Sequence, residues 1–86
     1  MEKSAKMIMV LMDQTRLISQ IEEVGADIGE PDCKLTEPFV INNDGTLTPW
    51  LLDVTDENMF MISSDKILTI VEPNSTYLKI YEDLLK

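Results

Sequence analysis

The strongest turn signal in the chain lies within CKLTEPFVINNDGTLTPWLLDV, which spans residues 33–54. Asp44-Gly45 suits the positive φ angles of a tight hairpin turn, and apolar residues lie on both sides of it. We therefore expect a strand over residues 33–42, a hairpin turn, and a returning strand over residues 46–54. Pro38 lies inside the first of these strands and cannot donate a backbone hydrogen bond, which predicts an edge position or a β-bulge.

Two more strands are predicted on the N-terminal side of the hairpin. Residues 7–11 form an apolar run that ends at a polar turn, and the next strand begins at Thr15 or Arg16. Its apolar residues alternate as far as Ile21, but Val24 is out of step, so we expect a β-bulge or a sharp bend between Ile21 and Val24. Residues 25–32 contain two glycines, a proline and three acids, a composition typical of a loop.

The C-terminal side of the hairpin has short apolar segments at residues 59–62 and 67–71, separated by Ser63-Ser64-Asp65-Lys66. Five or six short strands joined by tight turns are typical of a barrel or a sandwich. The chain then changes period. Pro73-Asn74-Ser75 is a helix start, and an apolar stripe of helical spacing follows, which predicts an amphipathic helix over residues 74–86. The stripe consists of Tyr77, Ile80, Tyr81, Leu84 and Leu85.

The length of 86 residues predicts one domain over residues 1–86, with residues 1–6 as a short leader. Domains of this size often need a disulfide, a metal or self-association for stability. Cys33 is the single cysteine and there is no histidine, so an intrachain disulfide and the commonest zinc ligand are excluded. Self-association is the remaining expectation.

The net charge of −9 makes the averaged field repel phosphate and anionic lipid, which disfavours non-specific nucleic-acid binding. The longest apolar run, residues 7–12, is too short to cross a bilayer, and no basic stretch followed by an apolar segment begins the chain. We therefore expect no membrane partner and a cytoplasmic location.

Two segments resemble the paired motifs of the Sm and Sm-like family. The first, LMDQTRLISQI at residues 11–21, keeps the apolar positions and Asp13, but Gln14 and Ser19 stand where the family has glycine. The second, ISSDKILTI at residues 62–70, keeps the apolar frame without the family's Arg-Gly. The phrases EPDCKL and ILTIVEP are similar to short Sm-like proteins encoded by marine viruses of cyanobacteria, whose home would be the cytoplasm of a bacterial or virus-infected cell.

The resemblance, which covers residues 7–71, implies a Sm-like open β-barrel of five strongly bent antiparallel strands, here followed by the C-terminal helix. It also implies subunits joined edge to edge into homo-oligomeric rings of about five to seven. Family members that bind RNA use a loop after the second strand and the Arg-Gly loop, which correspond to residues 25–33 and 63–66. The candidate RNA contacts are therefore Lys34, Ser63, Ser64 and Lys66, although solvated loop residues remain the simpler interpretation.

Catalytic chemistry is not expected from these residues. The acids at Asp27, Glu30 and Asp32 match no loop of defined cation geometry, so we expect no metal and no cofactor. Cys33 has no histidine or basic cluster beside it and reads as a small buried residue rather than a nucleophile. We expect a protein that is not an enzyme.

Two functions remain open at this point. One is a non-enzymatic Sm-like ring that acts as an assembly or protein-interaction module; the other is an RNA-binding Sm-like ring in RNA processing or regulation. The helix stripe is the candidate interface. Its partner could be its own barrel, a neighbouring subunit or a different protein, and we favour the first two together.

Overall fold

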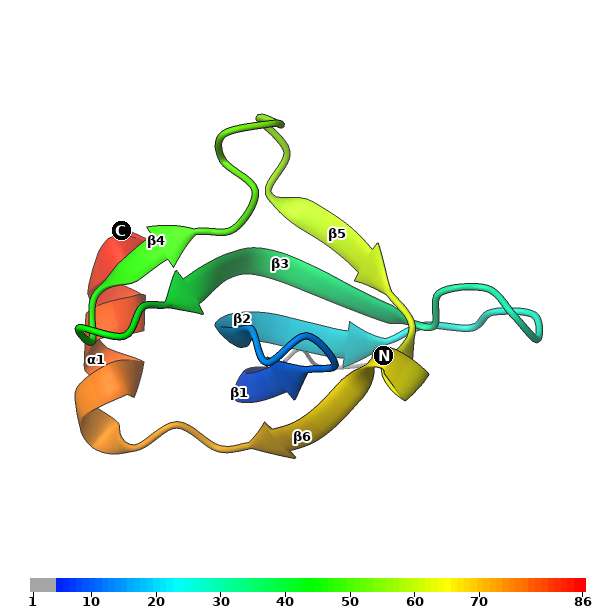
Figure 1. Cartoon of the computed structure of the whole chain (residues 1–86), viewed down its shortest axis with the longest axis horizontal. Helices are drawn as coiled ribbons and strands as arrows, with labels where there is room; N and C mark the ends of the chain where they lie inside the picture. The colour runs from blue at the N-terminus through cyan, green and yellow to red at the C-terminus, as the bar shows by residue number, and fades with distance from the viewer. Residues whose placement is uncertain (1–4) are drawn as a thin grey trace.

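The chain folds into a six-stranded antiparallel sheet with one C-terminal helix (Figure 1). The computed structural model describes residues 5–86. Its elements are β1 (Ala5–Leu11), β2 (Arg16–Glu23), β3 (Cys33–Ile41), β4 (Leu47–Pro49), β5 (Met59–Ile62), the 3₁₀ turn η1 (Ser64–Lys66), β6 (Ile67–Val71) and α1 (Ser75–Leu84). The strand order is β4-β3-β2-β1-β6, and β5 also pairs with β3. The predicted strands and terminal helix are thus present, with six strands instead of five.

The sheet is strongly curved, because β5 and β6 lie at its opposite edges yet are joined by four residues, 63–66. In a flat sheet the two strands would be four spacings apart, roughly 19 Å. The connection contains a 3₁₀ turn that rises only about 2 Å per residue, so it cannot span that distance. The sheet therefore curls until its edges approach each other. No pairing joins β5 to β6 within residues 5–86, so the sheet stays open.

A β-bulge in the middle of β3 separates the strand into two halves. The β2–β3 register passes from Ile18 opposite Phe39 to Gln20 opposite Thr36, so Glu37 and Pro38 together face one residue of β2. Glu37 has a positive φ of 54°. The N-terminal half of β3 pairs with β5 and the C-terminal half with β4. Pro38 therefore occupies a bulge in an internal strand, which was one of its two predicted positions.

The bulge inverts the two faces of β3 and so creates two cores. Without the extra residue, Leu35 and Phe39 would point to the same side. Instead Leu35 packs with Met9, Leu11 and Leu17 on the inner side of the curve, a cluster that we call the concave core. Phe39 packs on the outer side, under the helix, in a cluster that we call the helix core. The helix core consists of Ile18, Phe39, Ile41 and Tyr81.

The helix packs on its own sheet through one side only. Its N-cap is Asn74, whose side chain accepts a hydrogen bond from the Tyr77 backbone N–H at 2.9 Å. Tyr81 is fully buried and meets Phe39 edge-to-face, with ring centroids 5.8 Å apart. Tyr77 and Leu85 pack beside it at the margin of the helix core.

The Tyr81 hydroxyl fills the gap that the bulge leaves in the β-ladder. It accepts a hydrogen bond from the Gln20 N–H at 3.1 Å and donates one to the Glu37 carbonyl at 2.8 Å. Ser19, also fully buried, has its hydroxyl 3.1 Å from the Thr36 carbonyl. Backbone groups that lose their strand partners are thus satisfied by side chains, as buried polar groups must be.

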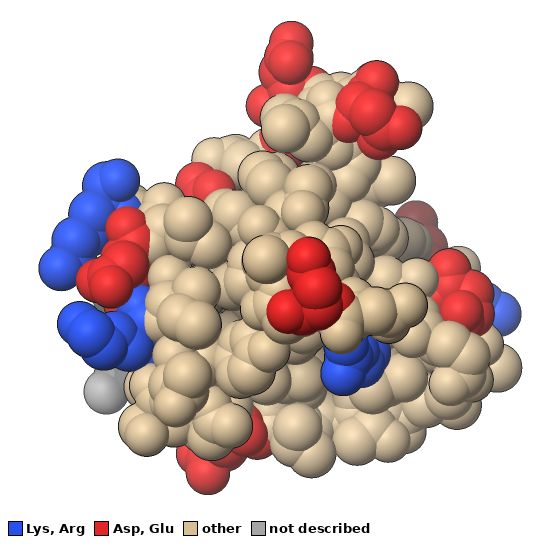
Figure 2. Space-filling model, turned by 60° about the vertical axis from the view of Figure 1, so that its left-hand side comes forward, with Lys and Arg blue, Asp and Glu red and all other residues tan. Residues whose placement is uncertain are grey.

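Three predicted boundaries were wrong. The β2 irregularity lies between Ile18 and Gln20, because it follows the extra residue of β3 rather than the alternation of β2 itself. The returning strand ends at Pro49, because its partner β3 bulges at Glu37 and Pro38 and residues 50–58 leave the sheet as a loop. In the predicted leader, Ala5 and Lys6 already belong to β1; residues 1–4 lie outside the described residues. The loop 50–58 stands out from the sheet (Figure 1), and the protruding part of the surface is rich in acids (Figure 2).

The β1–β2 turn contains a residue other than glycine with a positive φ. Gln14 donates its N–H to the Leu11 carbonyl at 2.9 Å and has a φ of 74°, in the left-handed region. An L-residue with a Cβ is strained there by about 1 kcal/mol, whereas glycine is not. Asp13 supports the turn by accepting a hydrogen bond from the Thr15 N–H at 3.0 Å.

We expect Gln14→Gly to raise the free energy of unfolding by about 0.5 to 1 kcal/mol, because relief of the strained φ outweighs the added freedom of the unfolded chain. Thermal unfolding followed by circular dichroism measures the change. Met12→Gly in the same turn is the matched control; Met12 has no positive φ, so this variant should be less stable than the wild type. An equal change in melting temperature in both variants would contradict the proposed strain at Gln14.

Candidate functional site

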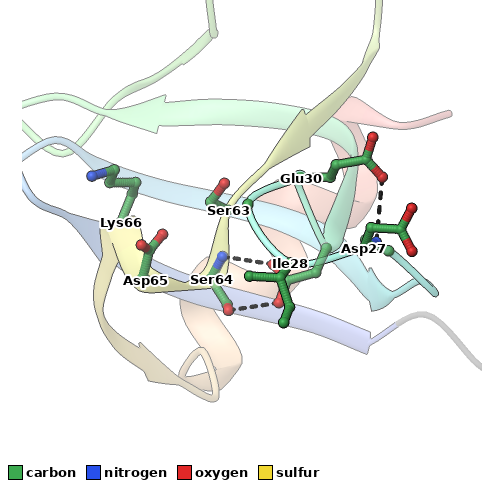
Figure 3. Close-up of a pocket in the computed structure, with 10 residues that line it drawn as sticks. Asp27, Ile28, Glu30, Ser63, Ser64, Asp65 and Lys66 are labelled. Atoms are coloured by element: carbon green, nitrogen blue, oxygen red, sulfur yellow. Dashed lines mark hydrogen bonds between the residues drawn. The ribbon is translucent and has the colours of Figure 1, made fainter.

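The two loops that the family resemblance singled out meet in the structure. Residues from 26–32 and 63–66 line one open pocket of about 540 Å³ (Figure 3). The loops are held together by Asp32, whose carboxylate accepts hydrogen bonds from the Ser64 backbone N–H and hydroxyl, both at 2.8 Å. Glu30 accepts a weaker one from the Asp27 N–H at 3.3 Å. The pocket is thus built by contacts between residues 32 positions apart.

These contacts fix the charge of Asp32. The backbone hydrogen bond from Ser64, followed by its hydroxyl, lowers the pKa of the Asp32 carboxyl below its ordinary value. The pKa values of Asp13 and Asp44 are lowered in the same way, by hydrogen bonds from the threonine two residues on. Because each pKa is lower when folded, each ionised carboxylate stabilises the fold above its unfolded pKa near 4.

We expect Asp32→Asn to weaken the pH dependence of stability. The contribution of Asp32 is complete at neutral pH and is lost as the pH falls from about 4 through the lower folded pKa. The wild type should therefore lose more of its free energy of unfolding between pH 7 and pH 3 than the variant does. Urea denaturation at the two pH values tests this, with Asp53→Asn in the loop 50–58 as a control for removing one charge. An equal pH-dependent loss in wild type and Asp32→Asn would show that the link to Ser64 contributes nothing.

The candidate RNA contacts are only partly brought together. Ser63, Ser64 and Lys66 line the pocket, and the Lys66 side chain extends away from Asp27 and Glu30 (Figure 3). Lys34 does not line it; its ammonium lies 3.2 Å from the Glu22 carboxylate across the β2–β3 pair. The carboxylates of the pocket are Asp27, Glu30, Asp32 and Asp65, against the single ammonium of Lys66. Such a lining disfavours a phosphate backbone.

Apolar side chains are exposed on two of the edge strands of the sheet. On β5, Met59 and Met61 are each 51% exposed, while the alternating Phe60 and Ile62 turn into the concave core. On β6 the exposed apolar residues are Leu68, Ile70 and Val71, at 52%, 45% and 47%. The sequence did not reveal this surface, because an uninterrupted apolar strand reads as buried on both faces.

The predicted helix interface is divided between two environments. Tyr77, Tyr81 and Leu85 face the sheet, which confirms that the helix packs on its own domain. Ile80 and Leu84 are exposed, at 39% and 47%, so that part of the stripe remains available to a partner.

One family model, described as a family of unknown function (DUF6561), matches residues 4–86. The match covers nearly the whole chain. The chain belongs to this DUF6561 family. A search of curated proteins found no match.

Two further features of this DUF6561 chain concern its thiol and its potential metal ligands. Cys33 is 3% exposed, and burial, followed by the Asp32 and Glu23 carboxylates, raises the pKa of its thiol. The thiol is therefore protonated at neutral pH and a poor nucleophile. Within residues 5–86 no three potential ligands are grouped for a metal ion. None of the described helices has the length and hydropathy needed to cross a membrane.

Proposed function

We propose that this chain is a non-enzymatic Sm-like protein that assembles into a ring and acts as an assembly or protein-interaction module. The observation that carries the proposal is the exposure of apolar side chains on two of the edge strands, β5 and β6. Edge strands present unpaired backbone groups, and natural proteins protect them with charges, prolines or a covering segment. Here methionine, leucine, isoleucine and valine occupy the exposed positions instead. Pairing β5 of one subunit with β6 of the next would cover both edges.

The path of the chain supports the Sm-like interpretation. The strand order places the last strand, β6, beside the first, and a short 3₁₀ turn links the two edges. The two residues that stand where the first family motif has glycine, Gln14 and Ser19, each meet a structural requirement that glycine would also meet. Gln14 has the positive φ, and Ser19 is the small, buried residue opposite the bulge at which the sheet bends.

Native mass spectrometry of gently purified protein tests the proposal. We expect one dominant species of about five to seven subunits, the ring size that the resemblance implies, because head-to-tail pairing of unlike edges gives a ring when the rotation between subunits closes. A monomer at micromolar concentration would overturn it. Open ladders of undefined length would also contradict ring closure.

An RNA-binding ring is the alternative, and the same spectrum decides it, because retained oligonucleotide adds mass to the assembly. Only the meeting of loops 26–32 and 63–66 favours this alternative. The acidic lining and the net charge of −9 oppose it. We expect a ring free of nucleic acid and no salt-dependent mobility shift of a uridine-rich oligonucleotide.

A further inference from the structure

A second hollow lies beside the bulge of β3, and we call it the bulge pocket. Its volume is about 210 Å³, and the residues used below that line it are Glu37, Pro38, Trp50, Asp56, Glu57 and Phe60. It exists because β4 pairs with one half of β3 and β5 with the other, so residues 50–58 must leave the sheet at the bulge and return. The Trp50 N–H donates to the Pro38 carbonyl at 3.0 Å where the loop leaves. The Glu37 N–H donates to the Asn58 carbonyl at 2.7 Å where it returns.

Two aromatic rings form one wall of the bulge pocket. Trp50 and Phe60 have ring centroids 5.4 Å apart with planes tilted by 50°. Both are only half-buried and pack against the concave core, which holds them in place. Both rings therefore contribute aromatic surface to the lining of the pocket. The negative face of an aromatic ring attracts a cation placed over it.

The charged groups of the bulge pocket are all acidic. Glu37, Asp56 and Glu57 line it, and no lysine or arginine does. The Glu37 carboxylate is oriented by a hydrogen bond from the Asn58 side-chain amide at 2.8 Å. Acidic side chains also crowd the protruding loop above it (Figure 2). An occupant of this pocket must be cationic and able to lie against an aromatic surface.

We propose that the bulge pocket binds an arginine side chain of a partner protein. A guanidinium is planar, stacks on aromatic rings and is more weakly hydrated than an ammonium, and its N–H groups would meet the carboxylates of Asp56 and Glu57. The volume accommodates one side chain and is below the usual size of a small-molecule site. Phe60 belongs to β5, one of the two edges that a ring would pair, but the inference itself requires no second subunit.

Trp50, the only tryptophan in the chain, reports on binding directly. The protein is titrated with N-acetylarginine amide at low ionic strength, and the Trp50 emission is followed. We expect a saturable change with a dissociation constant in the millimolar range, as suits one side chain. The neutral isostere N-acetylcitrulline amide should bind about tenfold more weakly, because it lacks the charge. No saturable change with the arginine probe, or equal binding of the two probes, would overturn the proposal.

Variants that each remove one charge locate the site. Asp56→Asn and Glu57→Gln should each weaken arginine binding by about threefold to fivefold. Asp53→Asn changes the same loop and the same net charge, but Asp53 does not line the pocket, so its affinity should stay within the error of wild type. Equal weakening by all three would indicate a diffuse electrostatic effect and would refute a site. Circular dichroism confirms that each variant is folded, and the shift of the Trp50 indole N–H in a ¹⁵N-labelled sample gives a second readout.

Discussion

Tyr81→Phe is expected to lower the free energy of unfolding by about 2 to 3 kcal/mol, although it removes a single oxygen atom. The hydroxyl accepts from the Gln20 N–H and donates to the Glu37 carbonyl, and both groups lost their strand partners at the bulge. Without the hydroxyl, two part-buried backbone groups lose a hydrogen-bond partner, each at a cost of about 1 to 3 kcal/mol. A domain of this size has a total stability on the order of 5 to 10 kcal/mol, so the effect is large. Burial, before any other influence, raises the Tyr81 pKa, so the phenol is protonated at neutral pH and can donate.

Urea denaturation and thermal unfolding measure the loss, which should lower the melting temperature by about 10 °C or more. Tyr77→Phe is the matched control on the same helix. Its hydroxyl makes one longer bond, 3.3 Å to the carbonyl of Gly45, at a site that water can reach. That variant should lose less than about 1 kcal/mol. If the two variants lose the same amount, the hydroxyl of Tyr81 does not support the bulge.

Met61→Lys and Val71→Lys are each expected to convert the ring into monomers at a concentration of about 10 µM, if the chain assembles as proposed. Met61 is on β5 and Val71 on β6, the two edges that would meet between subunits. Each is about half exposed and lies opposite a residue that does not point into the concave core, Lys34 for Met61 and Ile8 for Val71. A lysine there keeps the monomer folded and places a charge in the interface, as edge strands of monomeric proteins often do.

Native mass spectrometry and light scattering of each variant report the number of subunits. Val54→Lys is the control, because Val54 is 73% exposed in the loop 50–58 and lies on neither edge. It introduces the same charge and should leave the assembly intact. If both edge variants remain assembled while circular dichroism shows them folded, the edges are not the interface.

Local sequence signals predicted the secondary structure well. Asp44-Gly45 closes the hairpin between β3 and β4, with a φ of 89° at the glycine. Asn74 caps the helix that its sequence indicated, and the apolar runs became β1, β5 and β6. Each of these depends on interactions between residues a few positions apart, which composition and spacing express directly.

The candidate site was predicted less completely. The loops 25–33 and 63–66 were chosen by resemblance, and the structure brings them together, but Lys34 forms an ion pair with Glu22 instead. The exposed residues Ile80 and Leu84 belong to the same stripe as buried Tyr81. An apolar stripe wider than the surface it covers gives no sign of which members will be buried, because that depends on where the sheet ends.

The sequence by itself thus determined the order and type of the elements, the hairpin, the capped helix and the acidic surface. Only the tertiary structure decided where β3 bulges, which places Leu35 and Phe39 on opposite faces and opens the bulge pocket beside Trp50. The physical reason is that a bulge is selected by the strands on both sides of it and by the Tyr81 hydroxyl that satisfies its backbone groups. Those partners lie far away in the chain, so the alternation of apolar and polar residues within β3 alone cannot predict the bulge.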